Sequence, residues 1–374
     1  MNQNEKEIGE EKLSVIIAGG GTGGHLFPGI AVGKEIAKRF PVSDILFVTA
    51  GRDLETQILK RAGFRQESIM VEGIKGKGML GSLKSLFKLP LSLFQSLAVI
   101  KKISPDIILG VGGYSSGPLC LSGWLKKVPV AIHEQNSYPG LTNRLLSRVV
   151  DRVFISFEES RDCFPSGERL LTGNPVRDEF AKGSVIPAEK DRSFTIFITG
   201  GSQGAVAVNT VFLKSLEIMN KRGVKPGVIH HTGQYDYERV VKVYKEKGLD
   251  GELIPFIEDM ADTYNRADIF IGRAGAGTIF ELAATGTPAI LIPLPNSANR
   301  HQESNARALV NVGGAEMYNQ DQLTGEELAD RLIGYMNDGS LLVNMSENVR
   351  KAAKIDAVEK IVDEMCRLIE KGKQ

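Results

Sequence analysis

Runs of apolar residues alternate along the chain with stretches whose apolar positions recur at helical spacing. Buried strands of parallel sheets form such continuous runs, whereas helices show a period of 3.6 residues. The pattern predicts two sets of strands and therefore parallel α/β architecture. The first set is Leu13–Ala18, Asp44–Thr49, Ile107–Val111, Pro129–His133 and Arg152–Ile155; the second is Phe194–Thr199, Gly227–His231, Glu252–Ile254, Ile269–Gly272 and Ala289–Ile292.

Each set opens with a strand that runs into a glycine-rich loop. The segment FTIFITGGSQGA near residue 200 repeats the arrangement of IIAGGGTGG near residue 20. This internal repeat predicts two doubly wound, Rossmann-like domains, whose ligands bind outside the carboxyl ends of the strands. We assign residues 1–182 to the first domain and 183–374 to the second, with a last helix able to cross back. The polar segment Gly183–Arg192 is the predicted linker.

One segment departs from this alternation. Gly73–Lys102 carries six lysines and no acidic residue. Leu80, Leu83 and Phe87 fall at helical spacing, and after Pro90 a second helix repeats the spacing at Leu91, Phe94 and Ala98. Lysines beside an apolar face suit an interface with anionic lipid. The alternative is an ordinary amphipathic helix with solvated lysines, and the second helix is expected to be core.

Composition and charge exclude several classes of protein. A chain of 374 residues with 42% hydrophobic and 24% charged residues is typical of a soluble globular protein with two domains. A net charge of +1 provides no overall field for nucleic acid. The polar, acidic N-terminal stretch predicts no signal peptide, and no apolar run is long enough to span a bilayer. The scattered Cys120, Cys163 and Cys366 lack metal-ligand spacing, and no Asp-x-Asp is present, so no metal site is expected.

The first glycine loop, Gly19–Gly24, leads to His25 at the start of a helix. Glycines allow close backbone approach, and a helix N-terminus attracts anions, so the loop is predicted to hold a phosphate. His25 could act as a general base because histidine titrates near neutrality. It could instead be only a helix cap or phosphate contact. Glu134, at the end of a neighbouring strand, is a competing carboxylate or a partner that positions the base.

Three further segments present polar groups near predicted strand ends. Ser202, in the loop Gly200–Ala205, and the turn Arg273–Thr278 could meet a diphosphate. Arg177 could pair with a phosphate or lie on the surface. Glu281 could accept hydrogen bonds from a ribose diol, or be a helix glutamate favoured by the dipole. Gln302 and Asn305, three residues apart, could read sugar hydroxyls or lie in a solvated helix start. No loop has the spacing that nicotinamide cofactors require.

Several segments together resemble the MurG family, bacterial transferases that add N-acetylglucosamine from its UDP form to lipid-linked muramyl-pentapeptide. The segments are GGGTGGHLFPGIAV, GGYSSGP, HEQNSYPGLTNR, GNPVR, GGSQGA and RAGAGTIFELAATGTPAILIPLP…HQESNA, in order over roughly residues 13–310. The resemblance implies a GT-B fold with two Rossmann-like domains facing across a cleft, the acceptor in the first and the nucleotide sugar in the second. It implies inversion by direct displacement, with no metal or other cofactor, at the cytoplasmic face of the membrane.

The resemblance also implies roles for individual residues. His25 is the expected base, with Glu134 as the second catalytic candidate. Thr22 and the surrounding glycines are expected to meet the acceptor's diphosphate. Acceptor contacts are assigned to Gly20, Gly21, Tyr114 and Asn143. Donor contacts are assigned to Thr22, Gly23, Gly24, Asn136, Arg177, Ser202, Ile257, Gly277, Thr278, Glu281 and Gln302. Membrane contacts are assigned to Leu80, Leu83, Lys84 and Phe87. Some relatives carry two glutamines where this chain has His301-Gln302, which leaves the role of His301 open.

Two other functions fit the same pattern. A UDP-N-acetylglucosamine 2-epimerase has this fold but needs no lipid acceptor, so the lysine-rich segment Gly73–Lys102 argues against it. A regulator that binds a nucleotide sugar without turnover would keep the donor loops, but it has no reason to keep His25 and the HEQN segment at 133–136. Release of UDP that depends on the acceptor distinguishes the transferase from both.

Overall fold

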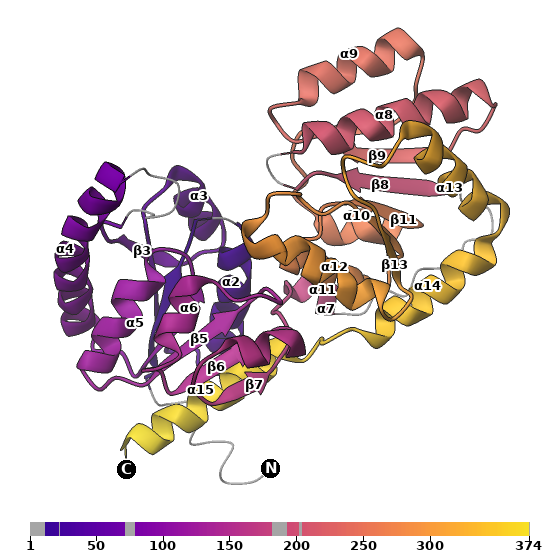
Figure 1. Cartoon of the computed structure of the whole chain (residues 1–374). Helices are drawn as coiled ribbons and strands as arrows, with labels where there is room; N and C mark the ends of the chain where they lie inside the picture. Colours follow the sequence, from indigo (N-terminus) through magenta and orange to yellow (C-terminus); the bar gives the residue numbers. More distant parts are fainter. Residues whose placement is uncertain (1–11, 22, 72–78, 182–192, 202–203, 374) are drawn as a thin grey trace. The chain divides into compact units, whose positions relative to one another are not determined.

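The computed structural model describes residues 12–21, 23–71, 79–181, 193–201 and 204–373, with side chains except at 79–88, 178, 181 and 298. The chain forms two compact units (Figure 1): Met1–Arg177 with Ile355–Gln374 (unit 1), and Asp178–Lys354 (unit 2). Unit 2 begins with α7 (Asp178–Ala181), where Phe180 packs edge-on against Tyr264. The division therefore precedes the predicted boundary after residue 182. The predicted linker Gly183–Arg192 lies outside the described residues.

Unit 1 contains a parallel sheet with the strand order β3-β2-β1-β4-β5-β6-β7 in the described part of the chain. The order reverses beside β1, so β1 and β4 form the switch point at which doubly wound sheets bind ligands. The strands are β1 (Ser14–Gly19), β2 (Asp44–Thr49), β3 (Arg65–Ser68), β4 (Ile107–Gly112), β5 (Val130–Glu134), β6 (Arg152–Ile155) and β7 (Arg169–Leu171). The helices are α2 (Gly23–Arg39), α3 (Asp53–Arg61), α4 (Met79–Ile103), α5 (Ser116–Leu125), α6 (Leu141–Leu146), the 3-10 helix η1 (Glu158–Cys163) and α15 (Ala357–Lys373).

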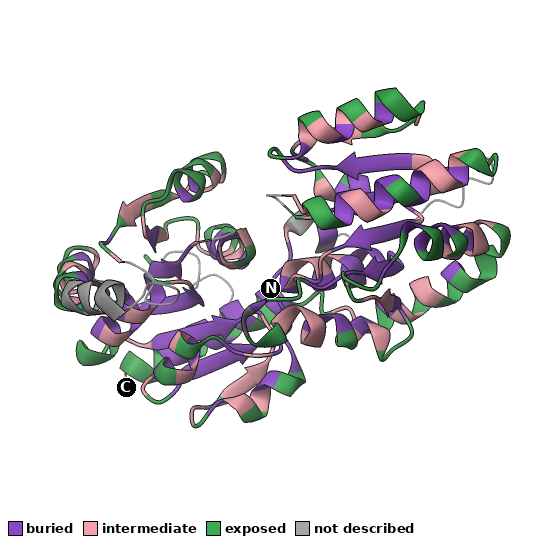
Figure 2. Cartoon of the chain, turned by 45° about the horizontal axis from the view of Figure 1, so that its top comes forward, coloured by how far each residue is buried: buried purple, intermediate pink, exposed green. Residues whose placement is uncertain are grey.

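Both faces of this sheet are covered. In β1, Val15 and Ile17 belong to one apolar cluster, whereas Ile16 belongs to the cluster on the opposite face. This follows from the two-residue period of a strand, and it explains why the strand reads as a continuous apolar run. The last helix, α15, contributes Ile361 and Met365 to the first cluster, next to α2. Figure 2 shows the strands buried and the helices exposed on their outer faces.

Unit 2 repeats the arrangement with the order β10-β9-β8-β11-β12-β13 among its described strands, all parallel. Its switch point lies between β8 and β11. The strands are β8 (Thr195–Thr199), β9 (Gly227–His231), β10 (Glu252–Ile254), β11 (Ile269–Gly272), β12 (Ala289–Leu291) and β13 (Ala315–Met317). Besides α7, the helices are α8 (Val206–Lys221), α9 (Tyr237–Lys247), α10 (Met260–Arg266), α11 (Ala276–Thr285), the 3-10 helix η2 (Ala298–Arg300), α12 (His301–Val310), α13 (Gly325–Asn337) and α14 (Gly339–Lys351).

The predicted strands are all present, with ends that differ by a residue at most. Three strands were not predicted: β3, β7 and β13. Each occupies an edge of its sheet and is only three or four residues long. Edge strands of this kind lack the buried apolar run that identifies a central strand.

Within the lysine-rich segment, the described residues from Met79 onward form one continuous helix, α4, with Pro90 inside it. The prediction of a separate core helix after Pro90 is wrong, because Leu91, Phe94 and Ala98 are exposed. The buried face instead carries Ser92, Ser96, Val99 and Ile100. Each serine hydroxyl donates to a carbonyl of its own helix, Ser92 to Leu89 and Ser96 to Ser92. Because these serines are small and their hydroxyls are already hydrogen-bonded within the helix, α4 can pack closely against α5 (Figure 1).

Candidate active site

The first glycine loop lies at the carboxyl end of β1, against the end of β4. A Cβ on Gly113, whose φ is +83°, would lie 2.3 Å from the carbonyl oxygen of Gly20. The Gly20 N–H donates to the carbonyl of Gly112 over 3.3 Å. The two loops thus pack backbone to backbone, which only glycine permits. Gly23 and Gly24 begin α2; Thr22, the other predicted contact in this loop, lies outside the described residues.

The buried carboxylate of Glu55 holds this loop by hydrogen bonds. The side chain of Glu55, on α3, accepts the N–H of Gly21 over 2.5 Å and that of Arg52 over 3.0 Å. Glu55 is only 1% exposed. The Gly21 N–H is therefore already satisfied, whereas the prediction assigned Gly21 to the acceptor's diphosphate. The sequence carries no signal for Glu55, because it lies 34 residues away on another element.

His25 lies in the first turn of α2 and is held by a residue that was not predicted. Its Nδ1 lies 2.9 Å from Oε1 of Gln135, which directly follows β5. The amide nitrogen of Gln135 lies 2.9 Å from the carbonyl oxygen of Val111 and 3.0 Å from Nδ1 of His133. Gln135 and His133 are buried, and burial lowers the pKa of His133 to about 4, so that it stays neutral near pH 7.

Gly112 provides the space that the imidazole of His25 occupies. A Cβ at this position would lie 2.9 Å from Nδ1 and 3.0 Å from Cε1 of His25, and the φ of Gly112 is +91°. We expect Gly112→Ala to displace the ring and to strain the backbone by about 1–3 kcal/mol. For the transferase that the family resemblance implies, turnover should fall at least tenfold while binding of the expected nucleotide sugar is retained. The matched control is Gly63→Ala, also at positive φ (+80°) but with open space around its Cβ. Equal losses in the two variants would contradict a role for the space beside His25.

Glu134, the second catalytic candidate, is buried and fully engaged. Its Oε1 accepts the backbone and side-chain N–H groups of Asn136, at 3.0 and 3.2 Å. Its Oε2 accepts the Gly140 N–H at 3.1 Å and the Asn143 amide at 2.8 Å. At 2% exposure the carboxylate positions the 136–143 loop. Its catalytic assignment stays a prediction, and this geometry favours a positioning role.

Three other predicted residues of unit 1 have distinct surroundings. Asn143 is 4% exposed, and its Oδ1 has no hydrogen-bond partner among the described residues, which leaves one buried acceptor for the predicted contact. Tyr114 follows the Gly112-Gly113 turn and is 43% exposed. The guanidinium of Arg177 lies 5.2 Å from the centre of the Phe27 ring on α2. The acceptor contacts of Asn143 and Tyr114 and the donor contacts of Asn136 and Arg177 stay predictions.

In unit 2, the glycine loop after β8 is held by a threonine. Oγ1 of Thr199 accepts the Gly201 N–H over 2.9 Å and lies 2.8 Å from Nδ1 of His231. A Cβ on Gly204 would lie 2.4 Å from the carbonyl oxygen of Thr232. The loop is therefore closely packed against the end of β9. Ser202 lies outside the described residues.

The turn after β11 has open space beside its backbone at Gly277. Nothing lies within 4 Å of a Cβ built on Gly277, in the first turn of α11, and Thr278 is half-buried beside it. One turn later, Oε2 of Glu281 accepts the Tyr264 hydroxyl over 3.3 Å. Ile257, whose backbone was predicted to read a uracil, lies in the loop after β10 and is 8% exposed. These residues follow β10 and β11, which lie on opposite sides of the switch point.

The loop after β12 is braced by two side chains. Arg273 donates to the carbonyls of Ile292 and Pro293, at 2.9 and 3.2 Å, and burial lowers its pKa. The anion-binding role predicted for the turn Arg273–Thr278 therefore does not involve a free Arg273 guanidinium. Oε1 of Gln302 accepts the Leu294 N–H over 2.9 Å. Asn305 is fully buried and donates to the carbonyl of Ala274, so it is not placed to read a sugar.

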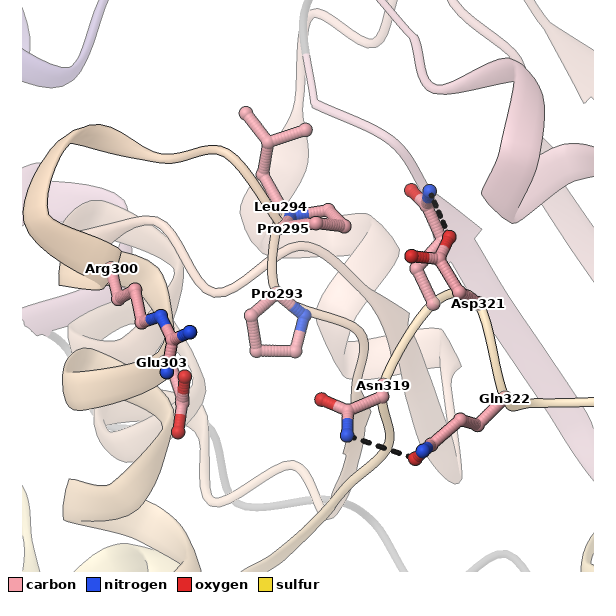
Figure 3. Close-up of a pocket in the computed structure, with 9 residues that line it drawn as sticks. Pro293, Leu294, Pro295, Arg300, Glu303, Asn319, Asp321 and Gln322 are labelled. Carbon is pink, nitrogen blue, oxygen red and sulfur yellow. Dashed lines mark hydrogen bonds between the residues drawn. The ribbon is translucent and has the colours of Figure 1, made fainter.

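A pocket lies beside this loop in unit 2. Figure 3 shows the proline-rich loop after β12 on one side and Asn319, Asp321 and Gln322 on the other. None of the described residues assigned to the donor is among those that line it, which are Pro293, Leu294, Pro295, Arg300, Glu303, Asn319, Gln320, Asp321 and Gln322. His301 begins α12 directly after Asn299 and Arg300, both at positive φ.

Two other kinds of feature are absent from the described ranges. None of the described helices combines the length and apolar character that crossing a membrane requires. No group of three or more His, Cys, Asp or Glu side chains is arranged there to hold a metal ion. The predicted membrane contacts Leu80, Leu83, Lys84 and Phe87 lie in α4, in the part whose side chains are not described.

Comparison with known proteins covers both units. Residues 15–155 match the glycosyltransferase family 28 N-terminal domain, and residues 195–361 match the C-terminal domain of the same family. A protein of Syntrophus aciditrophicus is 42% identical over 96% of this chain and 99% of its own length. It is named UDP-N-acetylglucosamine–N-acetylmuramyl-(pentapeptide) pyrophosphoryl-undecaprenol N-acetylglucosamine transferase.

Solved structures agree with the sequence matches. MurG of Acinetobacter baumannii aligns with a TM-score of 0.76 and 31% identity, over 96% of this chain and all of that one. The UDP-GlcNAc 2-epimerase of Neisseria meningitidis reaches a TM-score of 0.67 at 16% identity, over 96% of this chain and all of that one, which shows a shared fold alone. The predicted GT-B class with two Rossmann-like units is confirmed. The chain belongs to the MurG family within glycosyltransferase family 28.

Proposed function

We propose that this glycosyltransferase moves N-acetylglucosamine from UDP-N-acetylglucosamine to the C4 hydroxyl of muramyl-pentapeptide carried on undecaprenyl diphosphate. One observation carries the proposal: a relative named for this activity aligns with nearly the whole chain, through both glycine-loop units. The similarity to an epimerase is far lower in identity and extends to the fold only. The acceptor is assigned to unit 1 and the nucleotide sugar to unit 2.

In the proposed reaction, the C4 oxygen of the acceptor attacks C1 of the donor sugar while His25 takes the hydroxyl proton. The bond from C1 to the diphosphate oxygen breaks, UDP leaves with the electron pair, and the anomeric carbon inverts. The half-buried position of His25 at the start of α2 supports this role, because it combines access with a fixed ring. Glu134 supports His25 indirectly, by holding the loop that follows Gln135.

Donor binding is proposed for the carboxyl edge of the second sheet. The diphosphate would meet backbone N–H groups at the starts of α8 and α11, where the helix dipoles favour negative charge. The open space at Gly277 supports a close approach there. The backbone at Ile257 would read the uracil, Glu281 the ribose diol and Gln302 the sugar hydroxyls. We propose that the displacement uses neither a metal ion nor another cofactor, since these dipoles and amides stabilise the leaving diphosphate.

The test is release of UDP from UDP-N-acetylglucosamine, with and without a soluble lipid-diphosphate-muramyl-pentapeptide analogue. Acceptor-dependent release with an extended product supports the transferase. Interconversion of the free UDP-sugar without an acceptor would instead indicate an epimerase, and binding without either reaction a regulator. A parallel reaction in EDTA is expected to keep its rate, and a loss restored by a divalent cation would contradict the metal-free displacement.

We also propose that unit 1 docks on an anionic membrane surface through α4, α5 and α6, which lie side by side (Figure 1). The support is a set of exposed apolar residues that sequence reasoning did not assign to the membrane: Leu91, Phe94, Trp124, Leu125, Leu141 and Leu145. Phe94 is 70% exposed, and Trp124 directly precedes Leu125 and the exposed Lys126 and Lys127. Apolar groups beside lysines suit the headgroup region of anionic lipid.

Substituting Phe94 and Trp124 by Ser together should weaken binding to vesicles of mixed anionic and zwitterionic phospholipid by at least tenfold. Each aromatic ring would otherwise transfer part of its apolar area from water into the lipid interface. Vesicle co-sedimentation at low and high salt measures the effect. Tyr235→Ser is the control, because Tyr235 is 90% exposed but belongs to unit 2. Unchanged binding by the double variant would contradict docking through this surface.

A further inference from the structure

The hydrogen bonds around Gln135 determine where the protons of two histidines lie. The carbonyl oxygen of Val111 can only accept a hydrogen bond, and it lies 2.9 Å from one end of the Gln135 amide. That end is therefore the NH2 group. The other end, which faces Nδ1 of His25 at 2.9 Å, is the carbonyl oxygen and can only accept. Nδ1 of His25 consequently carries a hydrogen.

A second series of hydrogen bonds agrees with this orientation of the amide. The remaining N–H of Gln135 points to Nδ1 of His133, at 3.0 Å. Nδ1 of His133 therefore accepts, and its proton is on Nε2. That nitrogen lies 3.2 Å from the carbonyl oxygen of Gly173, which again can only accept. This series of hydrogen bonds therefore ends at the carbonyl oxygen of Val111 on one side and at that of Gly173 on the other. If the Gln135 amide were reversed, its oxygen would face two acceptors, the carbonyl oxygen of Val111 and Nδ1 of His133. The low pKa of His133 keeps it in this neutral form.

We infer that Gln135 is a positioning residue that holds neutral His25 as the Nδ1–H tautomer, with the lone pair on Nε2. No described residue hydrogen-bonds to Nε2 of His25. Nε2 is thus the atom that takes the C4 proton of the acceptor, and this last step rests on the function proposed above. When Nε2 takes the proton, Nδ1 keeps its bond to Gln135, so the imidazolium forms without rearrangement of the network.

A neutral amide suits this task. A carboxylate at the same place would favour the charged form of His25 before the acceptor hydroxyl could use it. Gln135 is 2% exposed and lies directly after β5, which pairs with β4, and β4 in turn pairs with β1. The three elements that contribute Val111, His25 and Gln135 are therefore neighbours at one edge. The carbonyl of Val111 and the amide of Gln135 lie near the ends of β4 and β5, whereas the imidazole of His25 lies in the first turn of α2, which follows β1.

The tautomer is measured directly by nitrogen NMR of the full-length chain labelled with 15N-histidine. The chain has five histidines, and His25→Ala assigns the resonances of His25. With His25 neutral, Nδ1 should resonate as a protonated nitrogen and Nε2 as an unprotonated one. Gln135→Glu, which places a carboxylate opposite Nδ1, should instead protonate both ring nitrogens of His25 and so lose this pattern. Gln135→Met, which has similar size but no hydrogen bond, should lose it. A wild-type spectrum with the proton on Nε2, or an unchanged tautomer in Gln135→Met, overturns the inference.

Kinetics separate positioning from a general structural role. Gln135→Met should lower kcat about tenfold, the worth of one hydrogen bond, with KM for the donor unchanged. In the His25→Ala background the same substitution should have no further effect on turnover. Equal losses in both backgrounds would show that Gln135 does not act through His25. The wild-type spectrum decides the tautomer even where the wild-type chain transfers no sugar, so failure of the inference and failure of the proposed function are distinguishable.

Discussion

Replacing His25 with Ala is expected to lower kcat by about 10²–10⁴-fold, the range in which a positioned general base contributes. Without the imidazole, the C4 hydroxyl of the acceptor must attack while it still carries its proton. Little donor affinity should be lost, because His25 is not among the proposed donor contacts and those that follow β10, β11 and β12 belong to unit 2. Acceptor-dependent UDP release measures turnover, and calorimetry measures the Kd for UDP-N-acetylglucosamine.

The matched variant is His25→Gln, which keeps a hydrogen-bonding group at the start of α2 but cannot take a proton near neutral pH. It should lose as much turnover as His25→Ala. If His25 were only a cap or a phosphate contact, Gln would restore most of the activity. Unchanged turnover in either variant would remove His25 from the role of base.

Replacing Arg152 with Ala should destabilise unit 1 by about 3 kcal/mol. Arg152, on β6, is a buried cation that pairs with Glu364 of α15 at 2.6 Å and with Glu168 at 2.5 Å. The side chains of Arg152 and Glu364 are 7% and 9% exposed. Removing the arginine leaves the Glu364 carboxylate buried without its main counter-charge. Among the described residues, only the exposed Arg367 then pairs with Glu364, at 3.0 Å.

This loss can be measured in the full chain, because its only tryptophan, Trp124, belongs to unit 1. Thermal unfolding followed by tryptophan fluorescence therefore reports on that unit. The midpoint temperature should fall by roughly 6–12 °C, given about 2–4 °C per kcal/mol for a unit of this size. Arg39→Ala is the control, since the Arg39–Asp363 pair also reaches α15 but is partly exposed and should contribute less than about 1 kcal/mol. Equal effects of the two substitutions would contradict a buried role for Arg152.

The apolar pattern was sufficient to predict the central strands from the sequence, and β1 shows the reason. Val15, Ile16 and Ile17 are fully buried on alternating faces, so every position in the run is selected for burial. The edge strand β3 has no such constraint: it is RQES, partly exposed, and paired on one side only. The face of α4 that packs inward was also missed, because Ser92 and Ser96 are polar in sequence and satisfied only within the helix.

The residues of the candidate site likewise fall into those that the sequence indicates and those that it does not. The glycine loops and His25 stand out in the sequence, since runs of glycine after a strand have a direct backbone reason. Gln135 and Glu55 do not stand out, because an isolated glutamine or glutamate has no local signature of its partner. Gln135 acts across 110 residues on His25, and Glu55 acts across 34 residues on Gly21. Asn305 is a residue that the sequence pattern wrongly indicated. Its spacing from Gln302 suggested a sugar contact, but its buried amide donates a hydrogen bond to the carbonyl of Ala274.

The sequence by itself determined two Rossmann-like units, the places of their glycine loops and the family, because these depend on local periodicity and on motifs of consecutive residues. Only the tertiary structure decided which atoms of the site are already satisfied. It showed that Gly21 donates to Glu55 and that Gln135 holds Nδ1 of His25. Hydrogen-bond partners at the edge of a parallel sheet come from different strand ends. Their distances are therefore set by the order of the strands in the sheet, which no local pattern of residues records.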